Sequence, residues 1–216
     1  MGGLYIEVAG VDVSAVTLVG YSITETLAQA PTCSLVIDDL DGLLPVQIES
    51  LADVTLRVPG YSTNLFRGQL TSDRVVGIRP GVRHSIGAEG YHRLLAKSIV
   101  APLSETTRTV TSDNDVSVVN TNPYVTDEGT AVSLVSEADI ICDLLDLYWE
   151  GPALDYSHIH EYGPKPDPPM RFSNVTLGEA IISVATRFLD TATFWIDADL
   201  AAHLEVMFVG GAGEGI

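Results

Sequence analysis

Basic residues and cysteines are scarce in this sequence of 216 residues. Lysine and arginine together number 11 against 29 aspartates and glutamates, which gives a formal net charge of −18 at pH 7. An acidic surface repels phosphate backbones, so sequence-specific nucleic-acid binding is disfavoured. The two cysteines, Cys33 and Cys142, are too few for a disulfide scaffold or a cysteine metal site. We predict that both are free, buried thiols.

Long apolar runs and targeting signals are missing as well. The longest uncharged apolar runs fall well short of the roughly 18 residues that a membrane span needs. The N-terminus, MGGLYIE, has no basic segment followed by an apolar core. We therefore expect a soluble protein that is made in a cytoplasm and has no direct membrane span.

The sequence also lacks the motifs of catalysis and metal binding. GxSxG, HExxH and glycine-rich phosphate loops do not occur. The best metal candidate is His158-Ile159-His160 with Asp155, Glu161 and Asp167 nearby, which we interpret as exposed loop residues. Asp38-Asp39-Leu40-Asp41-Gly42 lacks the glutamate that closes a calcium loop and is interpreted as a turn. We predict no catalytic, cofactor-binding or metal-binding residues, and a protein that is not an enzyme.

Core material and turn residues are plentiful. The chain is 46% apolar and holds 19 glycines and 11 prolines, which is typical of a globular, mainly β protein. Between residues 4 and 100, apolar or alternating segments are separated by Gly, Pro and Asp, and they predict the strands of a barrel or sandwich. These segments are LYIEV, VTLVGYSIT, TCSLVID, DVTLRV, LFRGQLTSDRVV and VRHSIGAE.

The last two segments predict a hairpin closed by a turn at Arg79-Pro80-Gly81. Alternation in residues 82–89 places His84 on the inward side, where we expect a satisfied core histidine rather than a ligand. The period then changes, which predicts a short amphipathic helix over one open end of the barrel. Its apolar face would contain Tyr91, Leu94, Leu95 and Ile99.

Two capped helices are predicted in the second half of the chain, beyond the poorly readable residues 101–135. Ser136 and Asp139 have the spacing of a capping box, and so do Thr176 and Glu179. Each pair precedes an apolar stripe of helical period. The proline-rich residues 162–169 between the helices are predicted to form an extended arm.

A hairpin is predicted after the second helix. Phe194-Trp195-Ile196 and residues 203–206 read as its strands. Asp197 and Asp199 lie in the intervening turn, where aspartate side chains bond neighbouring backbone amides, so we do not interpret them as a catalytic carboxylate pair.

These motifs, in this order, resemble the central hub protein of bacteriophage tail tips and baseplates. FRGQLTS at residues 66–72, followed by a hairpin and AEGYHRLL at residues 88–95, looks like the end of the hub's first barrel. The capped helix with its alanine-rich centre, the aromatic strand ending in Ile-Asp and the strand with a central His-Leu look like the hub's helical insertion domain. The resemblance covers most of residues 1–206.

The resemblance implies a β-rich, α+β architecture. An N-terminal β-barrel or sandwich would occupy residues 1–103, a small α+β insertion domain residues 104–209, and a glycine-rich tail residues 210–216. Hub proteins usually return to a second, related barrel after the insertion. Here that barrel is expected to be absent or truncated.

The function implied by the resemblance is structural. Several copies, expected to be three, would form a ring that closes the tail tube of a virion assembled in the host cytoplasm. The neighbours would be the distal tail protein, the tape-measure protein and the tail fibre or spike proteins, and DNA would pass through the ring. No cofactor is implied. We expect the copies to associate through strand edges and apolar patches.

Two other classes of protein stay open. A carbohydrate-binding or surface-recognition β-module would need exposed aromatic residues around a shallow groove, for which Trp149, Tyr156 and Tyr162 are candidates. A hydrolytic enzyme such as a tail-associated lysin would need a catalytic constellation that this sequence lacks.

Overall fold

The computed structural model describes residues 4–26, 29–100, 109–110, 125–126, 136–160, 172, 174–188 and 192–206. The chain divides into two compact units. The first, which we call the sheet unit, contains residues 1–93 and 196–200. The second, which we call the helical unit, contains residues 94–195 and 201–216.

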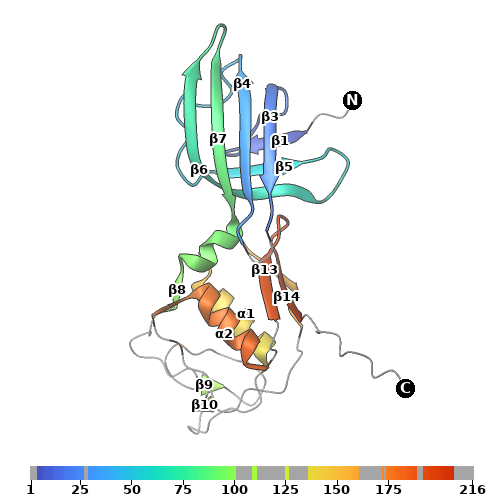
Figure 1. The fold of residues 1–216 in the computed structure, drawn as a ribbon, viewed down its shortest axis with the longest axis vertical. Coiled ribbons are helices and arrows are strands. Elements are labelled where there is room, and N and C mark those ends of the chain that lie inside the picture. Colours follow the sequence, from blue (N-terminus) through green and yellow to red (C-terminus); the bar gives the residue numbers. More distant parts are fainter. Residues whose placement is uncertain are drawn as a thin grey trace, which may run out of the picture. The chain divides into compact units, whose positions relative to one another are not determined.

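One curled, antiparallel sheet of seven strands forms most of the sheet unit (Figure 1). The strand order is β2-β1-β5-β6-β7-β4-β3, so β2 and β3 are the two borders. The strands are β1 (Tyr5–Val8), β2 (Val11–Asp12), β3 (Thr17–Thr24), β4 (Thr32–Asp39), β5 (Asp53–Arg57), β6 (Asn64–Gly77) and β7 (Val82–Gly90).

All six predicted strands are present, and the class prediction of a β-rich α+β protein is confirmed. The two-residue strand β2 is additional, because a pair of residues is too short to show a period in the sequence. The prediction of a barrel or sandwich is met in part. The strands form a single sheet curled into a half-barrel, in which the border strands β2 and β3 lie at opposite ends of the strand order.

The alternation of the strands explains the core of the sheet unit. Buried and less buried residues alternate in β4 and β7, so every second side chain lies on the inner face. Leu35, Ile37 and Phe66 are fully buried there. His84 is also on this face, 1% exposed, and its Nδ1 lies 3.1 Å from a carboxylate oxygen of Asp73. The prediction of a satisfied core histidine is therefore confirmed.

Turn 196–200 belongs to the sheet unit although it comes late in the sequence. Asn64 donates to Oδ1 of Asp199 from its backbone N at 2.9 Å and from its Nδ2 at 2.7 Å. Within the turn, the backbone N of Asp199 donates to Oδ1 of Asp197 at 2.9 Å, as predicted for an aspartate turn. The Asp199 carboxylate thus accepts from Asn64, which lies 135 positions away in the sequence. This contact was not predicted.

The helix predicted after β7 is a short 3₁₀ helix, η1 (Tyr91–Ala96). Ile99 does not belong to it. The backbone N atoms of Lys97 and Ser98 both donate to the carbonyl of Leu94, which ends the helix. Ile99 then enters β8 (Ile99–Val100), which pairs with β12 (Val175–Thr176), so the predicted apolar face was one residue too long.

The described part of the helical unit contains two α-helices, one three-stranded sheet and two two-stranded sheets, β10-β9 and β12-β8. Helices α1 (Glu137–Tyr148) and α2 (Leu177–Phe188) pack on each other. A three-stranded sheet has the order β11-β14-β13. The strands are β9 (Thr109–Val110), β10 (Val125–Thr126), β11 (Asp155–His158), β13 (Ala192–Ile196) and β14 (Ala201–Val206), together with β8 and β12.

Both predicted capping boxes are present. The backbone N of Asp139 donates to Oγ of Ser136 at 3.1 Å, and the backbone N of Ser136 donates back to the Asp139 carboxylate at 3.0 Å. Thr176 and Glu179 make the same reciprocal pair at 3.2 and 2.8 Å. These bonds satisfy amide groups that a helix leaves open at its first turn.

Some predictions fall outside the described residues. They concern the extended arm at residues 162–169, the glycine-rich tail at residues 210–216, and the candidate residues Glu161, Tyr162 and Asp167. The predicted domain boundaries at residues 103 and 209 stay predictions. Among the residues the structure describes, no helix is both long and apolar enough to cross a membrane.

Candidate assembly surface

Other contacts are made by three of the residues considered for metal binding, namely Asp38, Asp155 and His158. In the described ranges, no three His, Cys, Asp or Glu side chains gather so that they could hold a metal ion. His158 lies at the end of β11, and Oδ1 of Asp155 accepts a bond from the backbone N of Ser157 at 2.8 Å. At the end of β4, Asp38 forms a two-bond ion pair with Arg83.

The two cysteines are both free thiols. Cys33 is buried as predicted, whereas Cys142 is only half-buried on α1. Burial raises the pKa of each thiol to about 11, and neighbouring carboxylates, first that of Asp146, add to the effect at Cys142. A thiol with such a pKa carries little thiolate at neutral pH, so neither cysteine is a good nucleophile.

Three aromatic rings stack across the three-stranded sheet of the helical unit. The rings of Trp195 and His203 have centroids 4.8 Å apart, and those of His203 and His158 have centroids 4.5 Å apart. Because β11 pairs with β14 in parallel, strands distant in sequence supply neighbouring rings. Sequence reasoning missed this row, although Trp195 and His203 could have been matched across the predicted hairpin.

Two of the three aromatic candidates for a carbohydrate groove, Trp149 and Tyr156, make hydrogen bonds within the helical unit. Nε1 of Trp149 donates to the carbonyl of Pro152 at 2.6 Å, and the ring lies against Gly151. The hydroxyl of Tyr156 donates to Asp146 at 2.8 Å, and burial followed by this bond raises the pKa of Tyr156. Both polar groups are therefore engaged within the fold instead of facing an open groove.

Strand β3 is the long border of the curled sheet. It pairs in antiparallel register with β4 from Thr17↔Asp38 to Thr24↔Thr32 and is last in the strand order. Every second backbone amide and carbonyl of a border strand points away from its sheet. Val19 and Tyr21 are each 50% exposed, while Leu18 and Ile23 pack against the core. One edge of β3 is thus hydrogen-bonded to β4, and its other edge is available for pairing with a further strand.

Charge is absent from the chain around this border. Residues 13–24 contain no charged side chain, although 19% of the whole chain is charged. Asp12 precedes the stretch, and its carboxylate accepts from the hydroxyl of Ser14 at 2.5 Å and from the backbone N of Ser14 at 2.8 Å. These two bonds lower the pKa of Asp12, so the carboxylate stays ionised and bound in the turn.

The opposite border is different. Strand β2 has two residues, one of which is Asp12, and it pairs only with Glu7 and Val8 of β1. Natural sheets commonly protect borders by making them short or charged. β2 has both protections. β3 is eight residues long and uncharged, and its pairing with β4 is interrupted by one register shift between Leu18 and Gly20. Strand β3 is therefore the surface of the sheet unit best suited to add a strand from a neighbour.

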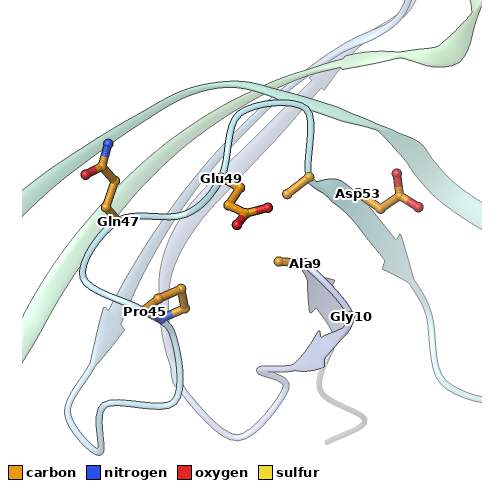
Figure 2. Close-up of a pocket in the computed structure, with 7 residues that line it drawn as sticks. Ala9, Gly10, Pro45, Gln47, Glu49 and Asp53 are labelled. Atoms are coloured by element: carbon orange, nitrogen blue, oxygen red, sulfur yellow. The ribbon is translucent and has the colours of Figure 1, made fainter.

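Two open hollows lie beside the loop between β4 and β5. One has a volume of about 510 Å³ and is shown in Figure 2, where Glu49 lies between Gln47 and Asp53 and faces Ala9. The other has a volume of about 690 Å³ and shares Gln47 and Glu49 with the first. The described lining of the two hollows is made of small, polar, acidic and aliphatic residues.

No protein-family model and no curated protein matches this chain. Its fold is similar to that of a tail protein from Neisseria meningitidis MC58, with a TM-score of 0.53 and 15% identity over 94% of this chain and 49% of that chain. It is also similar to the 43 kDa tail protein of prophage MuSo2 from Shewanella oneidensis, with a TM-score of 0.57 and 11% identity over 99% of this chain and 56% of that one. The chain therefore has a fold similar to that of these two tail proteins and spans about half the length of each.

Proposed function

We propose that this protein is a structural part of a phage tail, and that it forms the oligomeric hub of the tail tip or baseplate. The fold shared with two tail proteins, one of them from a prophage, extends over nearly the whole chain and supports the tail assignment. The hub assignment rests on the motif resemblance of residues 66–95 and 174–206. In this role the protein is not an enzyme and is located in the virion.

The long neutral border β3 supports an oligomer. Two copies of a chain with a net charge of −18 repel each other, and the repulsion is weakest where their facing surfaces are uncharged. Strand addition at β3 would satisfy its outward backbone groups and cover Val19 and Tyr21. We propose three copies, as in the hubs that the sequence resembles, closed into a ring by head-to-tail contacts.

The neighbours of such a ring would be the distal tail protein, the tape-measure protein and the fibre or spike proteins. DNA leaving the capsid would pass through the opening. The large excess of acidic residues supports passage without adhesion, because acidic walls repel the phosphate backbone.

Mass measurement in solution tests the oligomer. We expect a multiple of the 23.1 kDa chain mass, and we expect the double variant Val19→Lys with Tyr21→Lys to shift the protein towards single copies. Lysine is the usual protection of a border strand. Because two lysines reduce the net negative charge, weaker association cannot come from greater overall repulsion.

The matched control is Leu147→Lys with Ile182→Lys. Both residues are 38% exposed, on α1 and α2, and the charge change is the same. We expect this control to keep the wild-type mass. A wild-type protein that runs as a 23.1 kDa monomer at high concentration would contradict the hub. If that monomer bound carbohydrate, the recognition module would be the better assignment.

A further inference from the structure

The loop between β4 and β5, residues 40–52, is held firmly to the sheet unit, and we call it the rim loop. The Asp39 carboxylate accepts from the backbone N of Leu43 at 3.0 Å and from that of Leu44 at 2.8 Å. Leu44 and Ile48 are 5% and 4% exposed and belong to the core. The conformation of the rim loop is therefore set by the fold.

Four large apolar side chains of this anchored loop nevertheless face solvent. Leu40 is 46% exposed, Leu43 43%, Val46 73% and Leu51 55%. Single exposed aliphatic residues are common on any protein, but several on one loop indicate a contact surface. Surface loops otherwise favour polar residues, which solvate the backbone.

Leu51 adds an independent observation. Its φ is 68°, a left-handed conformation that glycine and asparagine adopt more readily than leucine. The backbone holds this conformation, because the N of Leu51 donates to the carbonyl of Leu70 at 3.2 Å. With more than half of its surface exposed, the leucine side chain contributes little to folding at a position that disfavours it. Contact with a partner would account for it.

The exposed charged residues that line the hollows beside the rim loop are acidic. The two hollows share Glu49, and Asp53 lines one of them. Asp73 lines the other, but its side chain is 5% exposed and lies 3.1 Å from Nδ1 of His84. None of the described lysine, arginine or histidine side chains lines either hollow. A partner that matched this surface would bring positive charge next to aliphatic side chains.

We propose that the rim loop is a docking surface for a partner protein segment in which lysine or arginine alternates with aliphatic residues. The aliphatic side chains would cover Val46 and Leu51, and the cations would lie in the hollows beside Glu49. Strand β3 takes no part in this contact. The proposal therefore goes beyond the hub and does not depend on ring formation.

Binding of a labelled peptide of alternating lysine and leucine to the full chain tests the proposal by fluorescence anisotropy. We expect saturable binding to the wild-type protein and much weaker binding of a glutamate and leucine peptide. Val46→Asp should weaken binding of the lysine peptide by about tenfold, as expected at the centre of an interface. Its control, Ile182→Asp on α2, makes the same charge change and should leave binding unchanged.

The sign of the Val46→Asp effect is decisive. An added negative charge strengthens non-specific attraction of a basic peptide, so only the loss of apolar contact predicts weakening. Absence of binding to the wild-type chain, or stronger binding to the Val46→Asp variant, would overturn the proposal. So would equal effects of the two variants.

Leu51→Asn separates docking from folding. Asparagine suits the left-handed conformation, so the thermal midpoint should stay or rise while peptide binding falls severalfold. A lowered midpoint with unchanged binding would show that Leu51 serves the fold and would overturn its assigned role. The mass of each variant, measured in the same samples, should equal that of the wild type, which keeps this test distinct from the test of the hub.

Discussion

At the scale of single residues, Asp39 links a strand to a surface. It closes β4, is 1% exposed, and accepts backbone bonds from the first residues of the rim loop. Burial acts to raise its pKa, but the backbone N–H groups of Leu44, Leu43 and Gly42 and the nearby His84 lower it more. The pKa of Asp39 therefore lies below its ordinary value, and the carboxylate is ionised wherever the protein is folded near neutral pH.

Replacing this carboxylate should cost stability in a pH-dependent way. The side-chain amide of the Asp39→Asn variant offers one acceptor oxygen, so one backbone N–H loses its partner, at a cost of about 1–3 kcal/mol near neutral pH. A lowered folded-state pKa stabilises the fold above the unfolded pKa of about 3.9, and that stabilisation is lost as the pH falls through the folded value. The difference in the free energy of unfolding between variant and wild type, measured by urea titration, should thus become smaller below about pH 4.

Asp41→Asn is the matched control for this prediction. Asp41 lies in the same loop and is exposed. Its replacement should change the free energy of unfolding by no more than about 0.5 kcal/mol. Two results would contradict the prediction: an equal loss in the free energy of unfolding for both variants, or a larger loss for Asp39→Asn in acid. In either case, the bonds from Leu43 and Leu44 to Asp39 would not be the source of the stability.

At the scale of elements, the two helices begin where their side chains satisfy open amides. Ser136 is 3% exposed, so its bond to Asp139 is shielded from competing water. The buried stripe of α1 follows directly: Ile140, Ile141, Leu144 and Leu145 are each no more than 1% exposed. The cap therefore fixes both the start of the helix and the rotation that buries this stripe.

Removing the α1 cap should destabilise the helical unit. Ser136→Ala leaves the backbone N of Asp139 without its side-chain acceptor, and the expected cost is about 1 kcal/mol. Ser183→Ala is the control, because Ser183 is exposed within α2 and alanine is the better helix former. The midpoint temperature of thermal unfolding should therefore fall for Ser136→Ala and rise slightly for Ser183→Ala. A neutral Ser136→Ala would mean that the cap is dispensable.

The elements that were predictable from the sequence are those that local chemistry defines. Both capping boxes and all six strands depend on residues a few positions apart, and the inward His84 follows from alternation. Contacts between distant segments were not predictable. The bond of Asn64 to Asp199 and the stacking of His158 on His203 arise from pairings that no local period encodes.

The ends of elements show the same limit. Ile99 fits a helical spacing after Tyr91, but pairing of β8 with β12 takes it into a strand. The surface that we propose for assembly was predicted only as strand edges and apolar patches in general. Choosing β3 required the strand order, because the sequence alone does not say which uncharged strand lies at the border.

At the scale of the whole molecule, the net charge of −18 opposes contact between copies, while an uncharged border favours it. An oligomer built through β3 would therefore be held by backbone bonds and apolar contact against a general repulsion. Salt reduces that repulsion, since the screening length falls from about 8 Å at physiological ionic strength to about 3 Å at 1 M.

Added sodium chloride should consequently strengthen assembly. Sedimentation equilibrium at low salt and at about 1 M should show the dissociation constant of the oligomer falling by roughly tenfold. The Val19→Lys and Tyr21→Lys double variant should remain largely single copies at both concentrations, because salt does not restore a blocked border. Dissociation of the wild-type oligomer by salt would mean that ion pairs hold the copies together, and β3 would then be the wrong surface.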